Sequence, residues 1–183
     1  MVRWVAVVLV GCGFQPATVT ATGDDASATG SGDARPIDAR PIDAARVCPP
    51  PPTGCSAFAC SGSGSCYYLC AKRSWTAAAS ACGMQHIGCI VTINDQAEQD
   101  CIVAASNPVF PDVVWFGFVQ APNSVEPAGG WGWQCGSSTY VAPNWGSGEP
   151  NNQGGHEDCA AMTTGGGWFD ADCTTQARYV CEL

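Results

Sequence analysis

Two neighbouring stretches decide the fold: Glu149-Pro150-Asn151-Asn152-Gln153-Gly154-Gly155-His156-Glu157-Asp158-Cys159 and Trp168-Phe169-Asp170-Ala171-Asp172-Cys173. They gather carboxylate and amide side chains beside a proline, and each ends in a cysteine. Hard cations such as Ca²⁺ take about six to eight oxygen ligands from carboxylates, amides and backbone carbonyls. We therefore expect this region to form an oxygen-rich loop that binds a cation.

Charge and cysteine content exclude several classes of protein. Sixteen acidic against seven basic residues give a net charge of −9. This charge argues against a nucleic-acid partner, which needs a basic face, and against binding to an anionic membrane surface. Thirteen cysteines without a CxxC pair, and two histidines without zinc-finger spacing, favour structural disulfides over metal sites. We therefore expect an exported protein, held in the cell envelope or secreted.

The N-terminal segment, residues 1–12, is predicted to be a lipoprotein signal peptide. Arg3 precedes a short apolar run from Trp4 to Val10, which is too short to span a bilayer as a helix. Leu9-Val10-Gly11-Cys12 resembles a bacterial lipobox, in which the cysteine carries a lipid. A buried N-terminal strand is the alternative. Lipidation of Cys12 would leave twelve cysteines, an even number for six bridges, and would restrict membrane contact to the lipid anchor.

Residues 13–47 are predicted to form a disordered tether. They are rich in small and polar residues and contain the tandem repeat Ala34-Arg35-Pro36-Ile37-Asp38 and Ala39-Arg40-Pro41-Ile42-Asp43. A segment of this composition cannot bury enough apolar surface to offset the entropy of ordering its chain. The folded domain is therefore expected to occupy residues 48–183.

Apolar patterning within this domain predicts a mixture of helices and strands. Val113–Phe118 is apolar on both faces, which is typical of a central strand. Ser74 is expected to cap a first helix that Gly83 ends, and Asn94 or Asp95 to cap a second one. The predicted strands are Tyr67–Leu69, Ile90–Ile93, Val113–Phe118 and Arg178–Cys181, the predicted helices are 74–82 and 95–105, the predicted core aromatics are Trp131, Trp133, Trp145 and Trp168, and residues 144–167 are predicted to have little regular structure.

The order of several short motifs resembles the C-type lectin-like domain from about Cys55 to Leu183. The resemblance implies an α+β fold in which two helices pack on small antiparallel sheets, with a long irregular ligand loop and many disulfides. Together with the lipobox-like motif, it leads us to interpret the chain as a bacterial lipoprotein that carries such a domain. The motifs are Cys66-Tyr67-Tyr68, Trp115-Phe116-Gly117, Asn144-Trp145, Glu149-Pro150-Asn151, Glu157-Asp158-Cys159, Trp168-Phe169-Asp170 and Tyr179-Val180-Cys181-Glu182.

The resemblance also implies three disulfides, Cys82–Cys181, Cys159–Cys173 and Cys55–Cys66. Six further cysteines lie outside the pattern of the family, and six cysteines allow 15 pairings. Their pairing stays open at this point. They are Cys48, Cys60, Cys70, Cys89, Cys101 and Cys135.

In sugar-binding members of that family, the matching residues coordinate one Ca²⁺ together with two sugar hydroxyls. Carried over to this chain, the resemblance implies that Glu149, Asn151, Glu157 and Asp170 bind Ca²⁺, and that the first three also bind the sugar. It further implies a cis peptide bond before Pro150 and a preference for mannose-type sugars.

Phe169 departs from the family pattern, because it stands where the family has an asparagine. A phenyl ring offers no amide oxygen to Ca²⁺ and no NH₂ group to a sugar, so we expect weaker binding of both. The ring is expected to pack into the core or, as the alternative, to stack on the ligand.

The function that these observations favour is that of a calcium-dependent, carbohydrate-binding surface lectin whose partner is a glycan or glycoconjugate. The alternative is a calcium-independent domain that keeps the same scaffold for a protein partner. An enzyme is not expected, because no nucleophile–base pair is apparent and the carboxylates crowd beside amides, as in a cation site.

Overall fold

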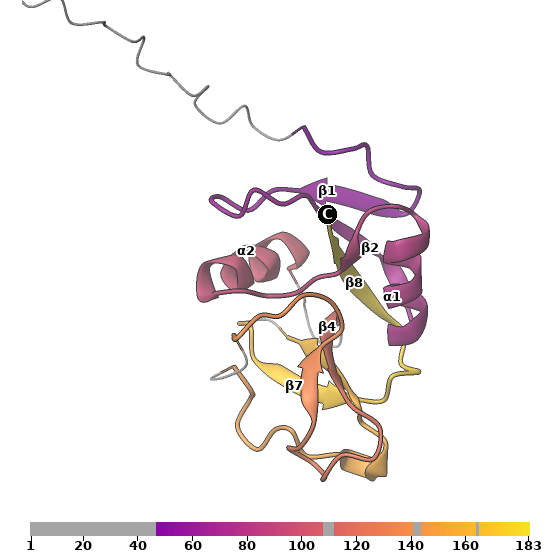
Figure 1. The fold of residues 1–183 in the computed structure, drawn as a ribbon, viewed down its shortest axis with the longest axis vertical. Helices are drawn as coiled ribbons and strands as arrows, with labels where there is room; N and C mark the ends of the chain where they lie inside the picture. The colour runs from indigo at the N-terminus through magenta and orange to yellow at the C-terminus, as the bar shows by residue number, and fades with distance from the viewer. Residues whose placement is uncertain (1–46, 108–111, 141–143, 164) are drawn as a thin grey trace, which may run out of the picture. The chain divides into compact units, whose positions relative to one another are not determined.

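The computed structural model describes residues 47–107, 112–140, 144–163 and 165–183. The predicted signal peptide with Cys12, and residues 13–46 of the predicted tether, lie outside these residues. The sheet has the strand order β1-β2-β8-β4-β6-β7, with β3 paired to β8 and β5 paired to β4 (Figure 1). Its strands are β1 (Cys55–Phe58), β2 (Tyr67–Arg73), β3 (Cys89–Ile90), β4 (Val114–Gln120), β5 (Trp131–Trp133), β6 (Cys159–Met162), β7 (Trp168–Ala171) and β8 (Ala177–Glu182), and its helices are α1 (Trp75–Met84), α2 (Gln96–Ser106) and the 3₁₀ turn η1 (Gln153–Gly155).

The sheet is mixed rather than wholly antiparallel. Strand β4 runs parallel to β8 on one side and antiparallel to β6 on the other. Trp115 and Phe116 project to opposite faces of β4 and both are fully buried. The prediction of a central strand here is therefore confirmed, because each face of β4 is covered by a separate part of the core.

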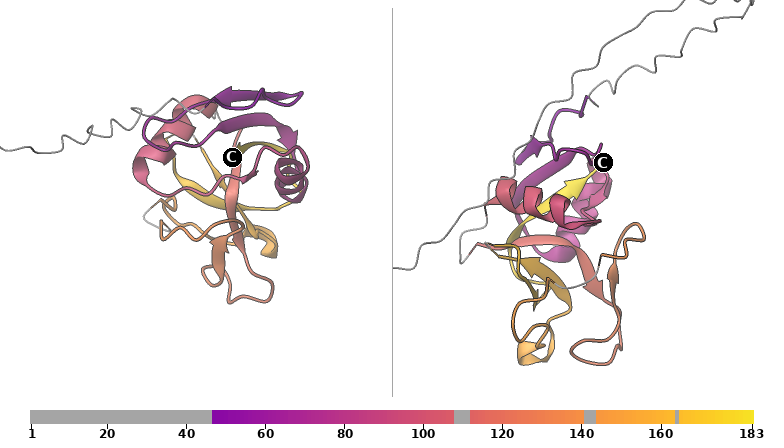
Figure 2. Two further views of the ribbon diagram at one scale, coloured as in Figure 1. Left: turned by 45° about the horizontal axis from the view of Figure 1, so that its top comes forward. Right: turned by 90° about the vertical axis from the view of Figure 1, so that its left-hand side faces the viewer.

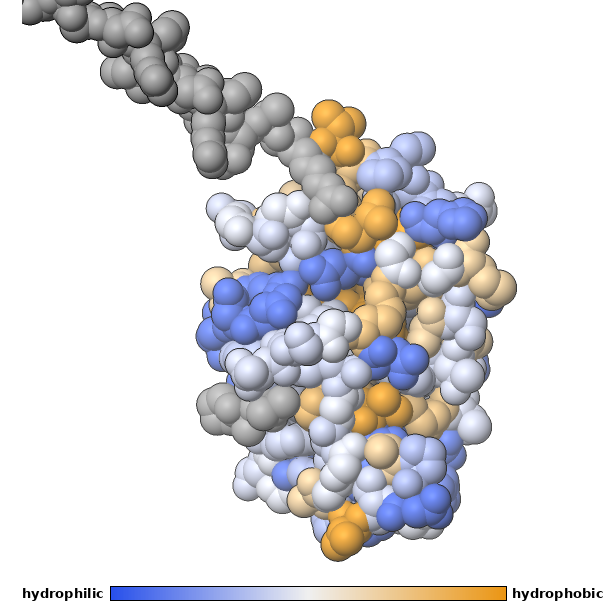
Figure 3. Space-filling view, in the orientation of Figure 1, coloured by the Kyte–Doolittle hydropathy of each residue, from blue (hydrophilic) through white to orange (hydrophobic). Residues whose placement is uncertain are grey.

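The two longer helices cover opposite faces of the sheet (Figures 1 and 2). Helix α1 packs Trp75, Ala78 and Cys82 into the core that contains Trp115, whereas α2 packs Ile102 into the core that contains Phe116. Hydrophilic residues gather over the outer side of α2 (Figure 3). No helix in the described ranges has the length and apolar content needed to cross a bilayer.

The ends of the helices match the sequence predictions in part. Asp95 caps α2 by accepting a hydrogen bond from the backbone N–H of Glu98 at 2.9 Å. Ser74 is the N-cap residue of α1, as predicted, but its side chain makes no capping hydrogen bond, so the prediction is confirmed in position only. The helix also continues through Gly83 to Met84, because the backbone of Gly83 stays helical.

Disulfides connect the elements of the domain at six places. The predicted Cys82–Cys181 and Cys159–Cys173 bridges are both present, and Cys60–Cys101 and Cys89–Cys135 resolve four of the open cysteines. Each bridge that closes a long loop stabilises the fold by about 2–4 kcal/mol. The six bridges use all twelve cysteines after Cys12.

The predicted Cys55–Cys66 bridge is wrong. Strands β1 and β2 form a hairpin whose register places Cys55 directly opposite Cys70, and these two residues are joined with a Cα–Cα distance of 4.0 Å. Cys66 lies just before β2 and is joined instead to Cys48, with a Cα–Cα distance of 5.5 Å. The hairpin register therefore decides the pairing.

The part of the sheet formed by β4, β5 and β7 holds a cluster of aromatic rings. Trp168 is fully buried, its ring centroid lies 4.7 Å from that of Phe116, and its indole N–H donates to Gln99 Oε1 at 2.9 Å. Trp131, Trp133 and Trp145 are half-buried and pack against this cluster. The core prediction is thus confirmed in full for Trp168 and in part for the other three tryptophans.

Regular structure extends further into the long loop region than predicted. Strand β6 lies inside the segment from 144 to 167 that was expected to be irregular, and it pairs with both β4 and β7. In the other direction, only Ile90 of the strand predicted at Ile90–Ile93 lies in a strand, because β3 covers Cys89–Ile90 and ends there. The short β3 still places the following chain against the edge of β8.

Candidate functional site

The loop from Glu149 to Glu157 leaves the sheet beside β7 and folds back on itself. Its first turn is closed by a hydrogen bond from the backbone N–H of Glu149 to Gly146 O at 3.0 Å. The peptide bond between Glu149 and Pro150 is cis, as the resemblance implied. Asn152 then adopts a left-handed conformation with φ 48°, which turns the chain into η1.

Asp170 on β7 anchors this loop through hydrogen bonds to its backbone. Its side chain is buried, with 2% of its surface exposed. The carboxylate accepts hydrogen bonds from the backbone N–H of Asn151 at 2.9 Å and from that of Asn152 at 2.6 Å. Because a carboxylate that accepts backbone N–H groups makes strong, charge-assisted bonds, Asp170 holds the Glu-Pro-Asn segment in place.

Glu149 and Asn151 lie next to each other at the mouth of this loop. The Asn151 side-chain amide donates to Glu149 Oε2 at 2.8 Å. Burial, then a hydrogen bond shared with Asp170, and then the negative charges of Asp170 and Glu157 raise the pKa of Glu149 to about 7. These carboxylates are therefore close enough to repel one another, and a bound cation would relieve that repulsion.

Glu157 lies across the loop from Glu149. Its Oε2 accepts from the backbone N–H of Gln153 at 2.6 Å, and its own N–H donates to Asn152 Oδ1 at 3.0 Å. Burial raises the pKa of the Glu157 carboxyl, and the charge of Asp170 adds to that effect. The structure thus places three of the residues predicted to bind Ca²⁺ in one loop and the fourth, Asp170, on the strand that anchors it.

The donor set suits Ca²⁺ in its chemistry. Glu149, Glu157 and Asp170 supply three carboxylates and Asn151 supplies one amide, and Ca²⁺ prefers such oxygen ligands. Among the described residues, however, no group of three or more His, Cys, Asp or Glu side chains is already arranged to hold a metal ion. In this arrangement Asn151 turns its NH₂ group toward Glu149, and Glu157 accepts a hydrogen bond from the backbone of Gln153. The residues fit the ion in their chemistry, and Asn151 and Glu157 would have to exchange these hydrogen bonds for contacts to it.

Phe169 lies on the face of β7 opposite to Trp168 and Asp170. It is directly across from Ala161 on β6, it is half-buried, and it packs against the core that contains Trp115. The ring also lines a pocket of about 490 Å³ that reaches Glu149. The expectation that Phe169 packs into the core is therefore confirmed in part, since one side of the ring remains open to the pocket.

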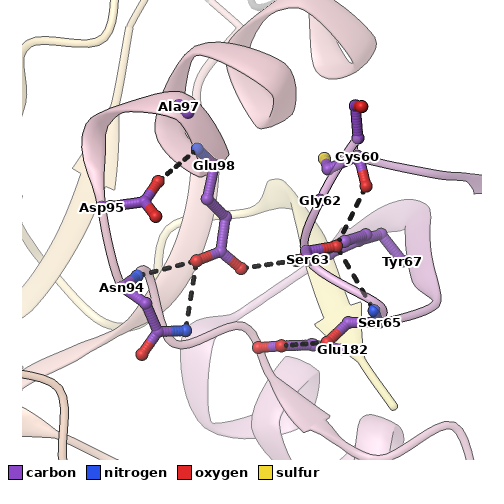
Figure 4. A pocket seen from close by; sticks show the side chains of 11 residues that line it. Cys60, Gly62, Ser63, Ser65, Tyr67, Asn94, Asp95, Ala97, Glu98 and Glu182 are labelled. Carbon is purple, nitrogen blue, oxygen red and sulfur yellow. Dashed lines mark hydrogen bonds between the residues drawn. The ribbon is translucent and has the colours of Figure 1, made fainter. Parts of the chain in front are cut away.

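A second cavity, which sequence reasoning missed, lies between α2 and the hairpin (Figure 4). Its volume is about 350 Å³, and the described residues that line it include Asp95, Glu98 and Glu182 but no basic residue. Glu98 is buried and accepts from the Tyr67 hydroxyl at 2.6 Å and from the backbone N–H of Asn94 at 2.8 Å.

Glu182 forms the other wall of this acidic cavity. It accepts from the Ser65 hydroxyl at 2.8 Å, and burial raises its pKa. Burial also raises the pKa of Tyr67, and its hydrogen bond to Glu98 adds to that rise. In the sequence, this cavity is indicated only by Glu98, the acidic residue three positions after the cap at Asp95. That spacing is equally typical of helix capping, so it does not by itself predict a cavity.

Comparison with known proteins matches this chain to C-type lectin domains. The family model described as "Lectin C-type domain" matches residues 71–183. Hepatic lectin from Gallus gallus is 35% identical over 121 residues, which cover 65% of this chain and 55% of that protein. Asialoglycoprotein receptor 1 from Mus musculus is 31% identical over 126 residues, 65% of this chain and 41% of the receptor. This chain thus spans about half the length, or less, of these two curated relatives.

Solved structures agree with the family match. The carbohydrate-recognition domain of mouse scavenger receptor C-type lectin superposes with a TM-score of 0.57 at 28% identity, covering 72% of this chain and 94% of that one. The C-type carbohydrate-recognition domain of cow CD23, solved in the presence of a GlcNAc2Man3 oligosaccharide, superposes with a TM-score of 0.58 at 28% identity, covering 74% and 97%. The relatives named here are animal proteins, so they lend no support to a bacterial lipoprotein, and the lipidation of Cys12 stays a prediction.

Proposed function

Because this chain belongs to the C-type lectin domain family, we propose that it is a calcium-dependent lectin for mannose-type sugars. In this proposal Glu149, Asn151, Glu157 and Asp170 hold the ion, and the first three also bond the sugar hydroxyls. C-type lectin domains generally bind Ca²⁺, although some members are independent of calcium.

The observation that carries the proposal is the anchoring of the Glu-Pro-Asn segment by the buried Asp170 carboxylate. The backbone N–H groups of Asn151 and Asn152 donate to this carboxylate at 2.9 Å and 2.6 Å, directly after the cis bond before Pro150. The loop is thus held with Glu149 and Asn151 side by side at its mouth. The relative solved with a mannose-containing oligosaccharide adds support for the sugar class.

A bound Ca²⁺ would supply positive charge to offset the negative charge of Glu149, Glu157 and Asp170. Burial raises the pKa of Glu149 and of Glu157, the negative charge of Asp170 adds to both rises, and a divalent cation would oppose them. With Phe169 in place of an asparagine, the chain would offer the ion one amide oxygen fewer, so we expect lower calcium and sugar affinities than with an amide there.

Titration calorimetry with methyl α-mannoside tests the proposal. We expect heat of binding in millimolar calcium and none in EDTA, and we expect a weaker response to methyl β-galactoside. Glu149→Gln should abolish the response, whereas Glu126→Gln, a change to an exposed carboxylate on another loop, should leave it unchanged. Absence of heat in calcium with correctly folded protein would remove the calcium-lectin proposal, and equal binding of the two glycosides would remove the sugar preference.

A calcium-independent protein-interaction domain is the second candidate, and Phe169 is the observation that favours it. Under that candidate, partner binding in EDTA equals that in calcium, and Phe169→Asn adds no calcium response. A pull-down of a partner that needs calcium would contradict it.

Location and activity are further parts of the proposal. Six disulfides among the described residues suit an oxidising compartment, so we propose a protein of the cell envelope, anchored through a lipid on Cys12, or a secreted one. We propose no catalytic activity. Mass spectrometry of the mature N-terminus tests the anchor directly, since a diacylglyceryl adduct on Cys12 is either present or absent.

A further inference from the structure

The pocket beside Glu149 has a chemistry unlike that of the calcium loop. We call it the apolar pocket, and it is formed by Val113, Gly146, Glu149, Phe169 and Ala171 together with neighbouring residues. Its volume of about 490 Å³ lies within the range of small-molecule sites, about 300–1,000 Å³. Among the described residues of its lining, Glu149 is the one that carries a charge.

Strand β7 explains why this pocket is apolar. Side chains two residues apart share a face of a strand, so Phe169 and Ala171 point to the same side. They face Ala161 and Cys159 of β6 across the ladder. An asparagine at 169 would place an amide at this position, whereas the phenyl ring gives the pocket an apolar wall.

The turn before Pro150 forms the opposite wall. Gly146 donates its backbone N–H to Trp168 O at 2.8 Å, which fixes this turn against the edge of β7. A Cβ atom added at Gly146 would lie 3.5 Å from Glu149 Cγ, so the aliphatic stem of Glu149 borders the pocket. The Glu149 carboxylate belongs to the proposed sugar site, and the two sites therefore meet at a single side chain.

We propose that the apolar pocket is a second subsite, which binds an alkyl substituent carried by the sugar ligand. This inference rests on the proposed function, because the sugar on the calcium loop is what presents the substituent at Glu149. The ligand class is then a glycoside with an apolar aglycone rather than a free or purely polar glycan. Phe169 is the residue that gives this specificity.

The expected effect follows from burial of the alkyl chain. Each fully buried methylene improves affinity by roughly fourfold, so even partial burial of a hexyl chain should give at least a tenfold gain. The test compares methyl α-mannoside with hexyl α-mannoside by titration calorimetry in calcium and uses the ratio of their dissociation constants as the readout. A ratio of at least ten supports the subsite, and a ratio near one with both glycosides binding overturns it.

Matched variants locate the effect. Thr175 lines the pocket and is exposed, so Thr175→Tyr should fill the pocket and bring the ratio close to one. Gln176 is the adjacent exposed residue outside the lining, so Gln176→Tyr should keep the full ratio. Phe169→Asn should also lower the ratio, by removing the apolar wall. A ratio that survives both Thr175→Tyr and Phe169→Asn places the alkyl chain elsewhere and overturns the inference.

A third arm separates this inference from the proposed function. If neither glycoside binds in calcium, the proposed function fails, and the pocket is then tested alone with 1-hexanol. Shifts of the ¹³C-methyl resonances of Val113 and Ala171 that are absent in Thr175→Tyr would support an apolar ligand site. Unchanged resonances would overturn it.

Discussion

Replacing Phe169 by asparagine should make the stability of the domain respond more strongly to calcium. The ring is half-buried against the core on one side and open on the other. Full burial of a phenylalanine contributes about 3 kcal/mol, so losing a half-buried ring should cost about 1–1.5 kcal/mol without calcium. In return, the new amide can offer Ca²⁺ the oxygen that the family pattern supplies and that this chain lacks.

Calcium should then offset the lost packing. If the new amide improves calcium affinity tenfold, it stabilises the folded form by about 1.4 kcal/mol at a given saturating calcium concentration. Urea denaturation in EDTA should show Phe169→Asn below the wild type, and denaturation in millimolar calcium should show the two nearly equal.

Phe169→Ala is the control, because it removes the same ring without adding an amide. It should stay below the wild type by a similar amount in both conditions. If calcium raises the unfolding free energy of the alanine and asparagine variants equally, position 169 does not contact the ion and the reasoning is refuted.

Three further predictions concern buried or crowded polar groups. Calcium affinity should fall about tenfold for each pH unit below 7, because a proton on Glu149, whose pKa is raised to about 7, competes with the ion; a flat calorimetric profile down to about pH 5 would contradict this. Tyr67→Phe should lower the unfolding free energy by about 1.5–3 kcal/mol in urea titrations, because the buried Glu98 carboxylate loses a donor at 2.6 Å, and an unchanged midpoint would show that the bond is not needed. Burial raises the folded-state pKa of Glu182, so its protonation stabilises the fold below the unfolded pKa of about 4.5, and that stabilisation is lost as pH rises. Glu182→Gln should therefore be more stable than the wild type at about pH 8 but not at pH 4. An equal difference in unfolding free energy at both pH values would count against this.

The sequence predicted best those features in which several local signals agree. The strand around Trp115 was recognisable because it is apolar on both faces, and such a strand must be covered on both sides. The start of α2 was recognisable from the pair Asn94 and Asp95, and the structure selects Asp95, whose side chain bonds the backbone three residues later. In both cases short-range chemistry decides the structure, so no knowledge of the rest of the chain was needed.

Features set by long-range register could not be obtained in the same way. The partner of Cys55 depends on which residue of β2 lies opposite, and a shift of the hairpin would select a different cysteine. Strand β6, Cys159–Met162, is short and contains no β-branched residue, and it becomes a strand because β4 and β7 lie on either side of it. The acidic cavity joins Glu98 on α2 to Glu182 at the end of β8, which no local pattern connects.

The candidate site combines both kinds of information at Asp170. Its presence in a Trp-x-Asp motif could be read from the sequence, but its role as an internal anchor could not, because that role depends on backbone N–H groups from Asn151 and Asn152. A carboxylate already committed to these bonds holds the loop in shape whether or not an ion is bound. Calcium affinity therefore depends mainly on how readily Glu149 and Glu157 exchange their present hydrogen bonds for the ion. That exchange, rather than the order of the loop, is what separates a calcium-dependent lectin from a calcium-independent scaffold in this chain.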